Sequence, residues 1–147
     1  MKLPDWKMSL TFSKELHLPA RLEELENLQA LVEEFLETAG CSPKTCNQIA
    51  VVTEEIFVNI AHYAYDGKAG EALVRIGTEG DFLIIQFEDA GKPFNPLDRP
   101  SPDTKASLGD RPIGGLGIYL TMKMMDGVYY ERIGGKNCLT IRKKIGG

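Results

Sequence analysis

Four polar residues recur along residues 54–67, which read EEIFVNIAHYAYDG, at a spacing that could bring them together. They are Glu55, Asn59, His62 and Asp66, and on a helix they fall within about 60° of one another. The apolar residues of the same helix centre about 100° away, so the polar line lies beside the apolar stripe. Side chains in this position can point into a cleft whose floor is a β-sheet. A solvated helix flank with a Glu55–Asn59 hydrogen bond is the alternative interpretation.

A second candidate element is FEDAGKPFNP, residues 87–96, which continues an apolar run. The carboxylate of Asp89 could accept a hydrogen bond from an exocyclic amine. Gly91, two residues later, would let a flat ring approach the backbone, because glycine has no Cβ. A simple turn after a strand gives the same Asp-x-Gly pattern, so this element alone does not decide between a binding site and a turn.

Three glycines precede a predicted helix in IGGLGIYLTMKMMD, residues 113–126. Gly114, Gly115 and Gly117 would expose backbone N–H groups near the positive end of a helix dipole, which suits a phosphate group. The segment lacks the GK[ST] ending of a Walker A loop. It also follows a proline-rich loop instead of a strand, which argues against a dinucleotide fingerprint. A glycine-rich loop that only begins a helix is the alternative.

The elements that must position these residues follow the order β-α-α-β-β-loop-α-β-β. Alternating or apolar runs predict strands over residues 8–18, 71–78, 82–88, 128–132 and 138–143. Helical periodicity predicts one helix that ends at Gly40, a second from Ser42 to about Tyr65, and a third over residues 115–125. This order predicts a single α+β domain over residues 1–147. We expect a two-layer sandwich in which a mostly antiparallel mixed sheet carries helices on one face.

Composition argues against several classes of function. The chain has 147 residues, is 43% hydrophobic and 26% charged, and carries a net charge of −4, so it lacks the basic character of a nucleic-acid-binding protein. No apolar run approaches the roughly 18 residues that span a membrane, and the N-terminus lacks the apolar core of a signal peptide. The three cysteines form no CxxC pair, which predicts neither a disulfide framework nor a zinc site. We therefore expect a cytoplasmic protein.

The ordered combination of these elements resembles the GHKL (Bergerat-fold) ATPase and kinase superfamily over nearly the whole chain. Three sequence boxes carry the resemblance: the N box in Glu55 and Asn59, the DxGxxF G1 box in Asp89, Gly91 and Phe94, and the G2 box in Gly115 and Gly117. Within the superfamily the chain is most similar to the bacterial anti-sigma-factor serine/threonine kinases, which are stand-alone domains of about this size. Residues 95–113 would then form the ATP lid.

The resemblance implies ATP and Mg²⁺ as cofactors and a role for each matched box. Asn59 would coordinate Mg²⁺, and Glu55 would be the catalytic residue that accepts the proton of an attacking hydroxyl. Asp89 would bind the adenine amino group, and Gly91 and Phe94 of the same box would be further cofactor-binding residues. Gly115 and Gly117 would hold the phosphates, while the lid closes over the triphosphate and excludes water.

The chain departs from the family pattern at three places. The Thr that often follows the glycine of the final hairpin is absent, and Asn137 is the candidate to substitute for it near the adenine. His62 lies one residue earlier than the histidine associated with the kinase subfamily, which favours a structural or partner-facing role. The lid is proline-rich, and its cations Arg99, Lys105 and Arg111 are candidates to contact phosphate.

These features leave three hypotheses about function. The first is an ATP-dependent serine/threonine protein kinase that acts as an anti-sigma factor, phosphorylates a STAS-type anti-anti-sigma partner and binds a sigma factor. The second is a regulatory module that binds ATP without catalysis. The third is the ATP-binding domain of a histidine kinase, which ranks last because the sequence shows no helical hairpin with a phospho-acceptor histidine. A homodimer is compatible with the resemblance, since the family commonly pairs through its sheet and first helix.

Overall fold

The computed structural model describes residues 10–98 and 122–146. Most of the predicted third helix, the glycines Gly115 and Gly117, and most of the predicted lid lie outside these described residues. The three lid cations lie outside them as well. The described residues include the sheet, the first two helices and the turns that connect them.

The first helix, α1 (Leu25–Ala39), follows a short 3₁₀ turn at Leu22–Glu24. It ends where predicted, because Gly40 takes a left-handed φ of 72° that stops the helix. Leu28, Val32 and Leu36 form its buried stripe. Among the described residues, no helix is long and apolar enough to cross a membrane.

The second helix, α2 (Pro43–Asn59), begins at the predicted cap. The side-chain oxygen of Ser42 accepts a hydrogen bond from the backbone N–H of Thr45 over 3.2 Å, and proline occupies the first turn. The helix then continues as one π-helical turn at Ile60–Ala64. The prediction of helix to about Tyr65 is therefore confirmed in extent, but the last turn is wider than an α-helical one.

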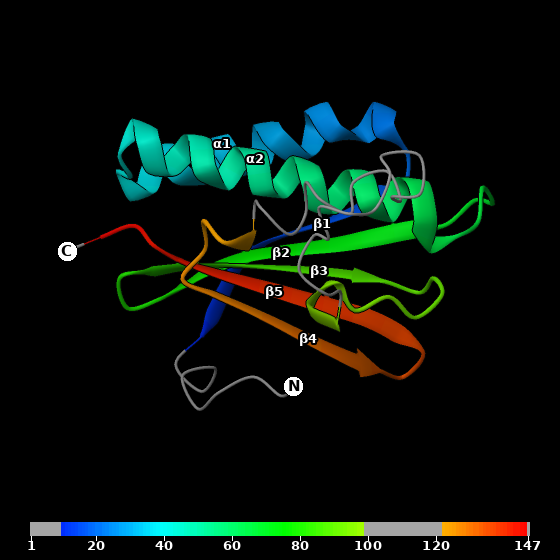
Figure 1. The fold of residues 1–147 in the computed structure, drawn as a ribbon. Coiled ribbons are helices and arrows are strands. Elements are labelled where there is room, and N and C mark those ends of the chain that lie inside the picture. The colour runs from blue at the N-terminus through cyan, green and yellow to red at the C-terminus, as the bar shows by residue number, and fades with distance from the viewer. Residues whose placement is uncertain (1–9, 99–121, 147) are drawn as a thin grey trace, which may run out of the picture.

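In the described part of the chain, five strands form a single sheet (Figure 1). They are β1 (Thr11–Pro19), β2 (Glu71–Glu79), β3 (Phe82–Asp89), β4 (Gly127–Ile133) and β5 (Lys136–Lys144). Their order across the sheet is β1-β2-β3-β5-β4, and each of the four described pairings is antiparallel. The expected α+β class is confirmed, and the described sheet contains no parallel pair.

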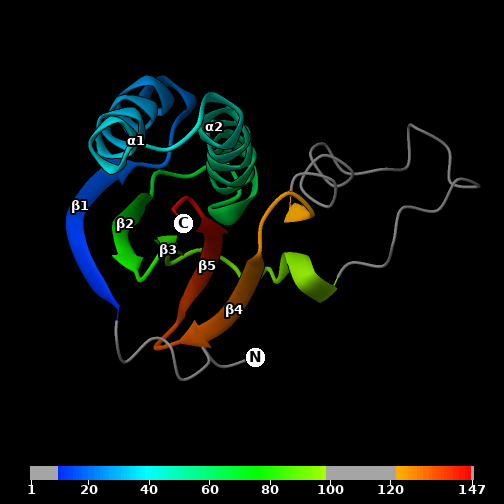
Figure 2. The same cartoon turned by 90° about the vertical axis from the view of Figure 1, so that its left-hand side faces the viewer.

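The two helices cover one face of the sheet and give the molecule two layers (Figure 2). The predicted apolar stripe of α2 faces the sheet, because Ile49, Val52 and Ile56 are at most 2% exposed. Alternate residues of the central strands pack against these side chains from the sheet, among them Ile85 and Phe87 on β3. The helix face and the sheet face thus close one continuous core.

The strand register places one row of residues at the same end of the sheet. Asp89 at the end of β3 lies opposite Asn137 on β5, and Asn137 lies opposite Arg132 on β4. The chain leaves β3 directly after Asp89 and passes close to this row. The row therefore supplies side chains to the space between this end of the sheet and the last turn of α2.

Candidate functional site

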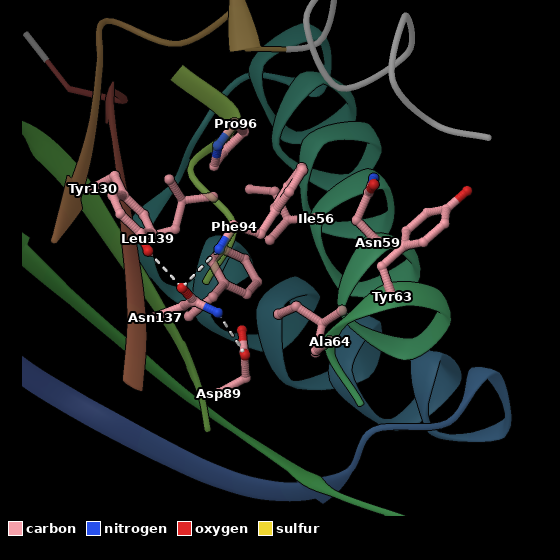
Figure 3. A pocket seen from close by; sticks show the side chains of 12 residues that line it. Ile56, Asn59, Tyr63, Ala64, Asp89, Phe94, Pro96, Tyr130, Asn137 and Leu139 are labelled. Carbon is pink, nitrogen blue, oxygen red and sulfur yellow. Dashed lines mark hydrogen bonds between the residues drawn. The ribbon is translucent and has the colours of Figure 1, made fainter. Parts of the chain in front are cut away.

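A pocket lies where the last turns of α2 face β3, β4 and β5 (Figure 3). The side chains of Asn59, Asp89 and Asn137 supply polar groups to it. The remaining lining residues are apolar or aromatic: Ile56, Ile60, Tyr63, Ala64, Phe87, Phe94, Pro96, Tyr130 and Leu139. A mainly apolar hollow with a few convergent polar groups is the usual form of a small-molecule site.

Asp89 brings a buried carboxylate to this pocket, with only 7% of its surface exposed. Its Oδ1 accepts hydrogen bonds from the backbone N–H of Gly91 and from the side chain of Asn137, each over 3.0 Å. Burial raises the pKa of Asp89, although these two hydrogen bonds and the charge of Arg132 oppose the shift. Since both hydrogen bonds that the described residues give to this carboxylate end on Oδ1, Oδ2 remains as an acceptor for a ligand.

Asn59 ends α2 and is 5% exposed. Its Nδ2 donates to the backbone carbonyl of Glu55 over 2.8 Å, which fixes the orientation of the amide. Its Oδ1 is buried and has no hydrogen-bond partner among the described residues. An unsatisfied buried oxygen costs about 1–3 kcal/mol, so this atom marks a place where a ligand could bind.

The Oδ1 of Asn59 fits the predicted magnesium ion. Mg²⁺ prefers oxygen ligands and is commonly held by one or two protein groups, substrate phosphates and water. The described residues contain no group of three or more His, Cys, Asp or Glu side chains that could hold a metal by themselves. The described residues could therefore offer the ion a single protein oxygen and leave its other positions to phosphates and water.

Glu55 lies one helical turn before Asn59 and is half-buried. Burial raises its pKa, and the neighbouring charge of Glu54 raises it further. Its side chain is not among those that line the pocket. The structure thus places the predicted catalytic carboxylate next to Asn59 and outside the lining of the apolar pocket.

The other two residues of the predicted polar line do not reach the pocket. His62 and Asp66 are exposed, and Asp66 forms an ion pair with Lys92 over 2.7 Å. The π-helical turn changes the angular position of every residue after Asn59, so a projection at 100° per residue does not hold there. Tyr63 and Ala64 line the pocket in their place.

The structure gives a steric reason for glycine at position 91, which the sequence pattern did not reveal. A Cβ on Gly91 would lie 2.1 Å from the backbone oxygen of Ala64, and that oxygen accepts a hydrogen bond from Lys92 N–H over 2.8 Å. Glycine is thus required where the end of β3 meets the end of the π-helical turn. Phe94 follows and lines the pocket as the G1-box pattern suggests.

Sequence reasoning missed several residues of the site. Tyr130 and Leu139 line the pocket from the terminal hairpin, and Arg132 Nη1 donates to the carbonyl of Gly91 over 2.8 Å. Alternation along the hairpin was the available signal, because it places Tyr130 and Leu139 on the helix-facing side of the sheet. The contribution of Gly115 and Gly117 stays a prediction, since both lie outside the described residues.

Known proteins match the sequence over most of its length. A family model for the histidine kinase-like ATPase domain matches residues 18–143. The chain is also similar to the serine-protein kinase RsbW of Bacillus licheniformis. The two are 29% identical over 126 residues, which cover 80% of this chain and 76% of that protein.

A solved structure shares the fold. The crystal structure of the RsbU and RsbW domains of Rv1364c from Mycobacterium tuberculosis superposes with a TM-score of 0.58 at 14% sequence identity. The match covers 92% of this chain but 33% of that longer chain. At this identity the likeness concerns the fold alone.

Proposed function

Because the chain belongs to the histidine kinase-like ATPase domain family, as its motifs predicted, we propose that the pocket binds the adenine ring of ATP. The buried carboxylate of Asp89 carries this proposal. Its Oδ2 would accept a hydrogen bond from the exocyclic amine of adenine. The apolar walls, among them Ile56 and Phe94, would cover the faces of the flat ring.

Asn59 would hold Mg²⁺ through its unsatisfied Oδ1. The ion, when bound, supplies positive charge to the phosphate oxygens. Asn59 lines the pocket from the end of α2, so in this proposal the phosphates of the nucleotide leave the adenine site beside it. Gly115 and Gly117 complete the phosphate site in this proposal.

Glu55 would act as the general base. Its carboxylate would take the proton of a serine or threonine hydroxyl while the hydroxyl oxygen attacks the γ-phosphorus and ADP leaves. A positioned general base typically contributes 10²–10⁴-fold to the rate. The raised pKa of Glu55 supports this role, because a carboxylate with a higher pKa is a stronger base.

The chain would use this chemistry as an anti-sigma kinase. It would phosphorylate a STAS-type anti-anti-sigma protein and bind a sigma factor when that partner is phosphorylated. The similarity to a protein named serine-protein kinase RsbW supports the proposal. The match of the histidine kinase-like ATPase domain model to residues 18–143 agrees with it.

Two measurements test the proposed function. Isothermal titration should detect Mg-ATP binding to the full chain, and Asn59→Ala should reduce the affinity at least tenfold in the presence of Mg²⁺. Transfer of ³²P from γ-labelled ATP to a STAS protein encoded beside this gene should give an acid-stable phosphoester. Glu55→Gln should slow that transfer about 100-fold or more while ATP affinity stays within about threefold.

The alternatives give different results. A regulatory module binds Mg-ATP but transfers no phosphate to any neighbouring STAS protein. An acid-labile product on a histidine would indicate histidine-kinase chemistry. Absence of Mg-ATP binding by the unmodified chain would refute the nucleotide site itself.

A further inference from the structure

We propose that Asn137 is the positioning residue of the adenine pocket, and that its amide sets the preference of Asp89 for a base with an exocyclic amine. The inference rests on the proposed function, because it assigns the base to the Asp89 side of the pocket. It goes beyond the motifs, which suggest only that Asn137 stands in for a threonine near the ring.

Asn137 uses its full hydrogen-bonding capacity within the site, and Figure 3 shows its bonds to Asp89, Phe94 and Tyr130. Its Nδ2 donates to Asp89 Oδ1 over 3.0 Å and to the carbonyl of Lys92 over 2.8 Å. Its Oδ1 accepts from the backbone N–H of Phe94 over 3.1 Å and from the hydroxyl of Tyr130. An amide offers two donors and two acceptor positions, so all four are occupied. The side chain is 5% exposed, which makes each of these bonds costly to lose.

The strand register explains why one residue reaches so many partners. Asp89, Asn137 and Arg132 form one row across β3, β5 and β4. The chain after Asp89 turns back over this row, where Asn137 holds it at Lys92 and Phe94. Arg132 holds the same segment at Gly91 through a 2.8 Å bond. The row therefore fastens the G1-box segment to the sheet, with Asn137 at its centre.

Of asparagine, aspartate and threonine, only the asparagine amide can make all four of these hydrogen bonds at position 137. Aspartate at the same place would keep the oxygen acceptors but would lose both donors. A threonine hydroxyl has a single donor, which cannot serve both Asp89 and Lys92. The arrangement therefore depends on the residue type at position 137 and not merely on its polarity.

The consequence for the ligand follows from the orientation of Asp89. With Oδ1 held by Asn137 and Gly91, Oδ2 is the atom left to accept from a base. A fixed acceptor favours adenine over a base that carries a carbonyl oxygen at the same ring position. If the donor on residue 137 is lost, the carboxylate can rotate or take up a proton and donate, and this preference weakens.

The charged groups around Asp89 set the pH response of this network. Arg132 on β4 lowers the pKa of Asp89, and Glu88 on its own strand raises it. Tyr130 on β4 contributes its hydroxyl through Asn137. In Asn137→Asp a second carboxylate faces Asp89, so the two should share one proton at moderately acidic pH. That shared proton restores a donor toward Asp89.

The test measures affinities of the full chain for Mg-ATP and for Mg-inosine triphosphate, which carries a carbonyl oxygen in place of the adenine amine. Asn137→Asp should weaken Mg-ATP binding at least tenfold at pH 8 and reduce the ATP-to-ITP preference at least fivefold. Relative to the unmodified chain at the same pH, the loss should shrink at least threefold at pH 6. The matched control Asn27→Asp, on the exposed side of α1, should leave every value within twofold.

Tyr130→Phe provides a second, milder variant in case Asn137→Asp does not fold. It removes one donor to Asn137 Oδ1 and should reduce the ATP-to-ITP preference at least twofold.

Equal weakening of the binding of both nucleotides, or a loss of affinity that does not recover at pH 6, would show that Asn137 has only a structural role. If the unmodified chain binds Mg-ATP and both variants bind it equally well, this inference alone fails. If the unmodified chain binds no ATP, both proposals fail.

Discussion

At the scale of single residues, Asp89 combines a cost in stability with the role in base recognition that we propose for it. A buried carboxylate favours its protonated form, and burial does raise the pKa of Asp89 above its usual value near 3.8. Because the folded-state pKa is the higher one, ionisation of Asp89 destabilises the fold at neutral pH. The cost disappears only when the pH falls below the pKa of the unfolded chain.

We therefore expect Asp89→Asn to stabilise the protein while it abolishes nucleotide binding. The new amide oxygen can still accept from Gly91 and Asn137, so the local structure is kept. The melting temperature at pH 7.5 should rise by about 2 °C or more, and this gain should shrink as the pH falls toward about 4. Affinity for Mg-ATP should fall about 100-fold or more, because the second atom of the amide is a donor. Thermal scans over this pH range and titration calorimetry measure the two effects.

Asp81→Asn, in the exposed turn between β2 and β3, is the matched control and should change neither quantity. A lower melting temperature for Asp89→Asn at pH 7.5 would contradict the expectation. It would mean that hydrogen bonds to the ionised carboxylate outweigh the cost of burying it.

Several residues that the sequence nominated through local spacing do lie close together, although their roles stay predictions. Asn59, Asp89 and Phe94 do line one pocket, and the i,i+4 spacing does place Glu55 beside Asn59. The four hydrogen bonds of Asn137 were beyond reach, because they depend on the register between β3 and β5. Registers are set by long-range pairing, which a single sequence does not display.

At the scale of elements, the sequence predicted the start of α2 correctly but did not predict the form of its last turn. Ser42 and Pro43 predicted its start, and the capping bond to Thr45 is present. The π-helical turn at the far end has no comparable local signal. The carbonyl of Ala64 accepts from Lys92, a residue that follows β3, so the form of this turn is tied to a tertiary contact.

The capping bond gives a prediction for α2. Ser42→Ala should lower the free energy of unfolding by about 1 kcal/mol, because it leaves an N–H in the first turn without its partner. Urea unfolding measures this loss as a lower midpoint with an unchanged slope. Affinity for Mg-ATP should change less than twofold, since Asn59 lies about 25 Å along the helix from the cap.

Ser42→Asn is the control for this prediction, because an asparagine oxygen can accept the same bond. Its stability should lie within about 0.5 kcal/mol of that of the unmodified chain. Equal destabilisation by both variants would indicate that Ser42 acts through packing and not through its cap.

At the scale of the whole molecule, the two layers form one core, and the sequence predicted this architecture from its pattern of apolar residues. Alternation marked the strands and a 3.6-residue period marked the helices, so the α+β class followed from local information. The complete pocket did not follow. It needs α2, β3 and the terminal hairpin to meet at one end of the sheet, and it exists only in the assembled fold.

Two of the three free cysteines can report on whether this assembly opens as a unit. Cys41 lies at the junction of α1 and α2, and Cys138 lies in β5 on the opposite layer. Burial raises the pKa of Cys41 to about 12 and that of Cys138 to about 11. Since both folded-state values are raised, the two thiols stabilise the fold at neutral pH, and this contribution is lost as the pH rises through those values.

We therefore expect iodoacetamide to alkylate Cys138 at pH 8 roughly 100-fold more slowly in the native protein than in urea, because the thiolate is the reactive form. Cys41 should also react more slowly, because burial and its hydrogen bond with Cys46 raise its pKa, and peptide mass spectrometry resolves the two sites. Saturating Mg-ATP should slow both reactions by the same factor if they require global opening, since ligand binding stabilises the folded state by mass action. Protection of one cysteine alone would show that the helical layer and the sheet open separately. Alkylation of native Cys138 at the rate seen in urea would contradict its burial in the sheet.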